Sequence, residues 1–158
     1  MKAEVRICFY ASTKLQGWRK FVIGLMCWSK HTHAHLELQC QKNRIVFLTM
    51  DGLQPRVVRL GLNKKFLGDT AYAEFSLGDI DYEEEDLIWA ENYPSTHHWD
   101  LIWYQFLRYW GLEDKDNPPP TCTTFLSDFL SRHGISVPRF FSPKQLWRYL
   151  YDDCNDWR

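Results

Sequence analysis

The sequence predicts an α+β fold in which a small antiparallel sheet packs against helices. Apolar and polar residues alternate over residues 3–10 and 31–41, which is typical of half-buried strands. The second half of the chain instead shows apolar residues at helical spacing, with proline and glycine where helices would begin and end. A length of 158 residues fits one domain of ordinary size, so we expect a single domain over residues 1–158.

The expected strands lie in the N-terminal part of the chain. Residues 3–10 alternate and predict the first strand. Residues 31–41 and 44–50 form two further runs joined by a polar break, which predicts a β-hairpin. Residues 56–60 are expected to form another strand.

Helices are expected at four places. Residues 13–29 have the spacing of an amphipathic helix, and the aromatic segment 97–110 predicts a helix or a junction of strand and helix. After three prolines, a helix is expected from Thr121 to His133, closed by Gly134 in the left-handed conformation. Ser142 and Pro143 predict the start of a last helix, as its cap and its first turn.

The stretch 61–95 has the weakest pattern. We interpret its acidic run, Asp79 to Asp86, as a solvated loop. The following segment, 86–92, is expected to form a short helix or a strand.

Composition argues against several classes of partner. The formal net charge is -1 at pH 7, so neither nucleic acid nor an anionic membrane is expected as a partner. No apolar run approaches the roughly 20 residues of a membrane span, and the first residues lack the apolar core of a signal peptide. We therefore expect a protein of the host cytoplasm or of a particle assembled there. Five cysteines without a CxxC pair predict neither a disulfide framework nor a zinc ribbon, and no cofactor is expected.

Cys122 is the candidate nucleophile. It follows Pro118 to Pro120, which cannot enter a helix interior, so it lies in the first turn of the expected helix. Unpaired backbone N–H groups and the helix dipole favour an anion there, and this setting lowers the pKa of a thiol. The alternative is a structural cysteine beside a threonine cap.

A histidine is expected to act as the general base for this thiol. His31, His33 and His35 alternate, so on a strand all three face one side. The sequence around His35 is that of a buried strand. A zinc site of the His-x-His type is the alternative, but the sequence offers no evident third ligand, so no metal is expected.

A third residue normally orients the imidazole. It should lie on the strand that pairs with the His35 strand, or on the same face two residues away. Asp51 is preferred on this basis, with Glu37 and Thr49 as alternatives.

The order of these segments resembles the permuted NlpC-type papain-like cysteine peptidases, which are related to the lecithin:retinol acyltransferase-like group. Residues 13–38 are similar to their helix and His-x-Glu-Leu strand, and residues 120–130 (PTCTTFLSDFL) to the start of their cysteine-bearing helix. Residues 139–150 (RFFSPKQLWRYL) are similar to their closing helix. The segment HHWDLIW, at 97–103, resembles an element of phage-encoded members.

The resemblance implies a permuted papain-like fold with Cys122 as nucleophile at a helix N-terminus and His35 as base. The implied reaction is acyl transfer, in which a cysteine hydrolase cleaves an amide bond in peptidoglycan or another peptide substrate. The alternative is a catalytically silent virion protein or a protein-binding module, whose partners would include other virion proteins. Residues expected to contact a substrate are Trp28, His33, Thr121 and Thr123.

Overall fold

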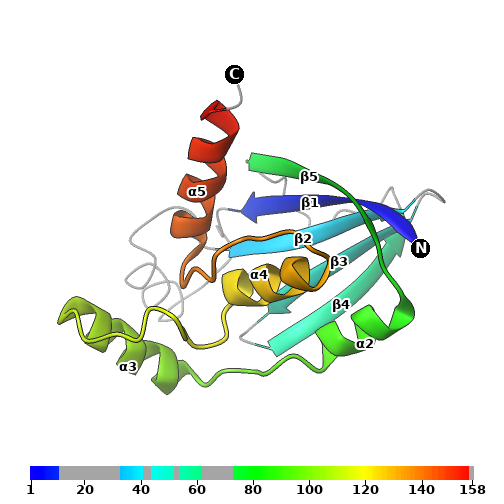
Figure 1. Ribbon diagram of the computed structural model, residues 1–158. Helices are drawn as coiled ribbons and strands as arrows, with labels where there is room; N and C mark the ends of the chain where they lie inside the picture. The colour runs from blue at the N-terminus through cyan, green and yellow to red at the C-terminus, as the bar shows by residue number, and fades with distance from the viewer. Residues whose placement is uncertain (11–32, 41–43, 52–53, 62–72, 157–158) are drawn as a thin grey trace.

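The computed structural model describes residues 1–10, 33–40, 44–51, 54–61 and 73–156. Over these residues the fold is α+β, with a five-stranded antiparallel sheet followed by four helices (Figure 1). The strands are β1 (Lys2–Tyr10), β2 (His33–Cys40), β3 (Arg44–Asp51), β4 (Gln54–Gly61) and β5 (Ala73–Asp81). The helices are α2 (Glu84–Glu91), α3 (His98–Tyr109), α4 (Cys122–Arg132) and α5 (Pro143–Asp156). The predicted helix over 13–29 lies outside the described residues.

The predicted strands are confirmed, and they pair in the order β4-β3-β2-β1-β5. Neighbours β2, β3 and β4 follow one another along the chain, so their short connections fix an antiparallel arrangement. β1 pairs with β2, and the register sets Cys8 opposite His35 and Arg6 opposite Glu37. This register decides which side chains from distant parts of the chain meet on the sheet.

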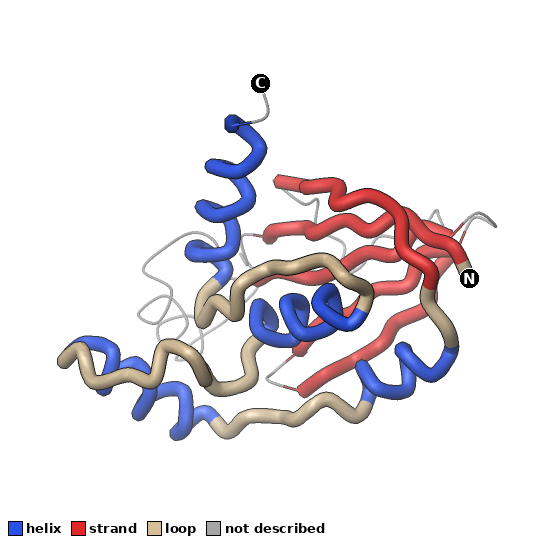
Figure 2. The backbone as a smooth tube through the Cα atoms, in the orientation of Figure 1, coloured by secondary structure: helices blue, strands red, loops and turns tan. Residues whose placement is uncertain are grey.

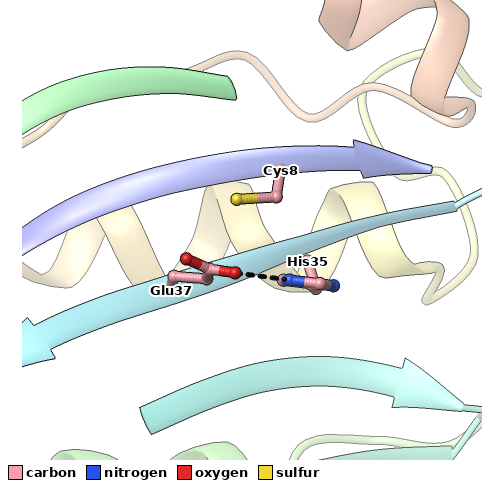
Figure 3. Close-up of side chains that lie close together, drawn as sticks. All are labelled: Cys8, His35 and Glu37. Carbon is pink, nitrogen blue, oxygen red and sulfur yellow. Dashed lines mark hydrogen bonds and ion pairs between the residues drawn. The ribbon is translucent and has the colours of Figure 1, made fainter. Parts of the chain in front are cut away.

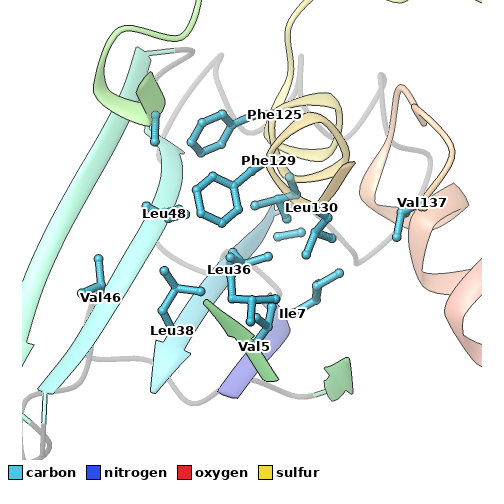
Figure 4. Packing of buried hydrophobic residues seen from close by; sticks show 14 of the residues in the cluster. Val5, Ile7, Leu36, Leu38, Val46, Leu48, Phe125, Phe129, Leu130 and Val137 are labelled. Carbon is cyan, nitrogen blue, oxygen red and sulfur yellow. The ribbon is translucent and has the colours of Figure 1, made fainter. Parts of the chain in front are cut away.

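The two faces of the sheet differ in chemistry. Alternate residues of the three central strands form an apolar face that is fully buried against α4 (Figure 4). The opposite face carries the remaining alternate residues, which include Cys8, His35, Glu37 and Phe47. The apolar face is formed by Val5, Ile7, Phe9, Ala34, Leu36, Leu38, Val46, Leu48 and Met50.

Helix α4 covers the middle of the apolar face, where it contacts β2 and β3 (Figure 2). Phe125 and Phe129 point from α4 into the core, and both are fully buried. Helix α2 lies along β4 and joins the same aromatic cluster, since Trp89 stacks on Phe125 with ring centroids 6.3 Å apart. Together these contacts make the sheet, α2 and α4 one packed body.

The interpretation of the acidic run as a solvated loop is wrong. Residues 73–81 form the edge strand β5, and the carboxylates that follow form the first turn of α2. Acidic side chains are favourable there because they face the unpaired N–H groups and the positive end of the helix dipole. Glu83 and Asp86 complete a capping box, and Arg59 on β4 is ion-paired with Glu84. The run therefore ends a strand and begins a helix.

The ends of α4 agree with the prediction. Thr121 caps the start by accepting a hydrogen bond from the N–H of Thr124. At the other end the N–H of Ile135 donates to Leu130 at 3.0 Å and that of Gly134 to Ser131 at 3.1 Å, which is the Schellman arrangement. Gly134 has a φ of 78°, so its predicted left-handed conformation is confirmed.

Replacing Gly134 with alanine should lower the free energy of unfolding by about 1 kcal/mol. An added Cβ meets no atom within 4 Å, so the cost comes from the left-handed backbone rather than from a clash. Urea unfolding followed by circular dichroism measures it, with Ser136→Ala as a control at an exposed position of the same loop. Equal stability of the two variants would contradict the assignment of this cap.

The described helices have neither the length nor the apolar character needed to cross a membrane. Helix α3 lies apart from the sheet and projects from the body (Figure 1). It begins at His98 and ends before Gly111, so the prediction of a helix over the aromatic segment is confirmed.

Candidate functional site

Cys122 is the first residue of α4, as the prolines before it predicted. Its side chain is partly buried and packs against the core, close to the start of β2. Burial raises the pKa of the Cys122 thiol, and the backbone N–H groups of Ala34, Thr123 and Cys122 itself lower it by less. The predicted stabilisation by helix N–H groups is therefore present, but burial exceeds it and the expected low pKa is corrected.

The structure does not bring His35 to Cys122. Ala34 and Leu36 belong to the core on the α4 side of β2, so alternation turns the intervening His35 to the other face. There its imidazole lies beside Cys8, Glu37 and the ring of Phe47. The sheet separates the two side chains, and this placement corrects the expected pairing of thiol and base.

Thr121 and Thr123, expected to contact a substrate, are buried parts of the α4 start. The hydroxyl of Thr121 lies 3.0 Å from that of Thr123 and also caps the helix. Thr123 donates to the carbonyl of Phe140 at 2.6 Å, which ties the loop before α5 to α4. These hydroxyls are used within the fold, and their contact with a substrate stays a prediction.

Three other predicted site residues are only partly covered by the structure. Trp28 lies outside the described residues. His33 begins β2 and Asp51 ends β3, and their side chains lie outside the described part as well. The alternative third residue Thr49 is fully buried in β3.

The imidazole of His35 has a carboxylate partner, and it is Glu37. Nε2 of His35 lies 3.3 Å from Oε1 of Glu37, two residues along the same face of β2 (Figure 3). The thiol of Cys8 faces them from β1 and is fully buried. Cys8 is not predicted from the sequence, because its place beside His35 depends on the register between two strands separated by 22 residues of chain.

A second feature is the aromatic stripe of α3, defined as Trp99, Ile102, Trp103, Phe106, Tyr109, Trp110 and Leu112. Trp99 is 78% exposed and Tyr109 82% exposed, and the others are exposed too. Positions 99, 103, 106 and 110 recur at helical spacing, so they lie on one side of the helix. Within α3 only Leu101 is buried.

The side of α3 opposite the stripe contacts the body. Tyr104 packs on Phe141 with ring centroids 4.7 Å apart, and the guanidinium of Arg108 lies over the same ring. Tyr104 also donates to the carbonyl of Asp114 at 2.8 Å. A pocket of about 420 Å³, with lining that includes Tyr104 and Arg108, lies at this junction. The helix is therefore anchored by one side and presents the other.

Similarity to known proteins explains neither feature. Comparison of the chain with protein-family models, with curated proteins and with solved structures finds no significant match. The chemistry of both features is therefore inferred from their own residues.

The segment that carries the stripe is acidic. Asp100, Asp114 and Asp116 are exposed on α3 and in the loop that follows it. Lys115, in the same loop, is within 4.0 Å of Glu113. Residues 97–117 carry four acidic and two basic side chains, a formal charge of -2 with histidines neutral.

Proposed function

We propose that the protein is a protein-binding module that docks the aromatic stripe of α3 onto an apolar surface of a partner protein. The observation that carries this proposal is the exposure of the stripe on a helix whose other side is anchored to the body. Contiguous exposed apolar side chains of this size commonly mark interaction sites, and aromatic residues dominate the energetic centres of protein interfaces.

The charges around the stripe favour a partner whose apolar surface is bordered by lysine or arginine. The acidic side chains of the segment that carries the stripe favour such a partner, because complementary charge guides association. An interfacial membrane helix would instead carry lysine and arginine on its polar face, to match anionic lipid. The formal charge of -2 over residues 97–117 favours a basic-rimmed protein over an anionic membrane.

Replacing Trp103 or Tyr109 with serine should weaken partner binding about 30-fold or more, the loss of a hot-spot residue of about 2 kcal/mol. A photoreactive residue at position 106 captures the partner in producing cells, and the purified partner is then titrated calorimetrically. Tyr151→Ser on α5 is the matched control, since Tyr151 is also an exposed tyrosine on a helix and lies off the stripe. The control should bind the partner with the affinity of the unmodified protein. Added salt should weaken partner binding by both.

Three results would contradict this proposal. The first is that the captured partner binds Trp103→Ser, Tyr109→Ser and Tyr151→Ser equally well. Vesicles of anionic lipid could bind the protein in a manner that depends on Trp103. The protein could also form a dimer through the stripe, which sedimentation over a range of concentrations detects.

The cysteine hydrolase of peptidoglycan or another peptide, and the permuted papain-like arrangement behind it, stay predictions from the resemblance. That mechanism needs an imidazole within hydrogen-bond reach of the thiol. His35 lies on the other face of the sheet, and the contacts described for the Cys122 thiol are with backbone groups. The geometry therefore favours the binding function, the alternative that the sequence also allows.

A further inference from the structure

The described residues contain one cluster of side chains that could hold a metal ion. The ligand atoms of Cys8, His35 and Glu37 all lie within 4.8 Å of one another. Cys8 and His35 face each other across the β1–β2 pair, and Glu37 follows two residues along the same face (Figure 3). The cluster is therefore held by strand pairing rather than by a loop.

These donors match the preferences of zinc. A cysteine sulfur, an imidazole nitrogen and a carboxylate oxygen are its usual protein ligands, at about 2.0–2.3 Å in a tetrahedron. Two donors bound at those nitrogen and oxygen distances lie roughly 3.4 Å apart. Nε2 of His35 and Oε1 of Glu37 lie 3.3 Å apart in their hydrogen bond. This pair already has the spacing that a shared zinc ion requires.

The charge of the cluster also favours a divalent cation. A thiolate, a carboxylate and a neutral imidazole together carry two negative charges, which one Zn²⁺ neutralises in this buried setting. Arg6 on β1 lies opposite Glu37 and interacts with it by charge, while its guanidinium is hydrogen-bonded to Glu4 at 3.0 and 3.1 Å.

We propose that Cys8, His35 and Glu37 bind one zinc ion. The metal takes the thiolate, and the thiol proton is released to solvent. Three protein ligands leave one position of the tetrahedron for water or a further ligand. The ion would link β1 to β2 on the face opposite α4, and this inference is independent of the docking of α3.

The test uses the full chain, stripped with a chelator and titrated with zinc against a chromophoric competitor. One zinc ion should bind per chain and raise the melting temperature, since the unfolded chain lacks the assembled site. Cobalt in place of zinc should give the near-ultraviolet charge-transfer band of a thiolate ligand. Mutation of residues that only hydrogen-bond to metal ligands typically weakens metal binding 10- to 100-fold. Cys8→Ser removes a ligand itself, so it should weaken zinc binding about 100-fold or more.

Two further variants keep the result decisive. Glu37→Gln preserves the size of the side chain and removes its charge, so it should also weaken zinc binding while the circular dichroism spectrum stays unchanged. Cys40→Ser is the matched control, because Cys40 lies on β2 outside the cluster, and it should bind zinc like the unmodified protein. The proposal is overturned if the chain takes up no zinc at micromolar concentrations, if Cys8→Ser and Glu37→Gln bind zinc unchanged, or if the cobalt form lacks the thiolate band.

Discussion

Replacing Phe129 with alanine should lower the free energy of unfolding by about 3–5 kcal/mol. Phe129 is fully buried between α4 and the sheet, where it faces Leu36 and Leu48 (Figure 4). It also touches Trp89 of α2, with ring centroids 6.2 Å apart. The substitution removes this contact area and leaves a cavity where three elements meet. Because marginally stable domains have only about 5–15 kcal/mol in total, this is a large fraction of the stability.

The matched control is Phe106→Ala, the same chemical change on an exposed helix position. Phe106 is 51% exposed, so in the isolated protein its loss should cost about 0.5 kcal/mol or less. Urea unfolding of both variants, monitored by tryptophan fluorescence and circular dichroism, gives the two free energies. Similar values for the two variants would mean that α4 does not pack on the sheet as described. If Phe106→Ala keeps full stability but loses partner binding, Phe106 serves the docking surface and not the core.

The elements that local sequence signals specify were predicted well. Alternation over residues 3–10 and over the following hairpin depends only on neighbouring side chains, and β1, β2 and β3 are confirmed. Prolines before Cys122 and the glycine after His133 mark the ends of α4 by backbone chemistry alone. The acidic run was misread because carboxylates suit a helix start as well as a solvated loop.

The candidate site was predicted less well because it depends on which face of the sheet each side chain takes. The apolar side of α4 must pack against the face of the sheet that carries Leu36 and Leu38. Alternation then places His35 on the other face, away from Cys122. This signal was present in the sequence, and so was Glu37 as a candidate partner of His35, whereas Cys8 was not readable because it reaches His35 only through the β1–β2 register.

The stripe of α3 was visible in the sequence only as an excess of aromatic residues. Its helix is amphipathic, with Asp100, Gln105 and Arg108 on the side away from the stripe, so spacing alone would turn the stripe toward a core. The contact of Tyr104 with Phe141 shows that the other side faces the body, and it joins segments 37 residues apart. Exposure of the stripe is therefore a tertiary property, although the residues that form it are local.

Cys122 should react with iodoacetamide at pH 7.5 more slowly in the folded protein than in urea, since a raised pKa lowers the fraction of the thiol that is thiolate at that pH. Only the thiolate reacts, and burial raises the pKa of the folded Cys122 thiol above its ordinary value. In the unfolded chain the rate should level off once the pH exceeds the ordinary thiol pKa, near 9.0. In the folded protein the alkylation rate at Cys122 should still be rising at that pH.

Pulsed alkylation with isotopically labelled reagent, followed by mass spectrometry of the peptide that contains Cys122, measures both rates. His35→Gln should leave the rate at Cys122 unchanged, because the sheet lies between the two side chains. His98→Gln, the same replacement on α3, is the control, and circular dichroism checks that both variants fold. Fast labelling of folded Cys122 that slows in His35→Gln but not in His98→Gln would restore the nucleophilic pair. That outcome would place the imidazole beside the thiol and favour the hydrolase over the binding module.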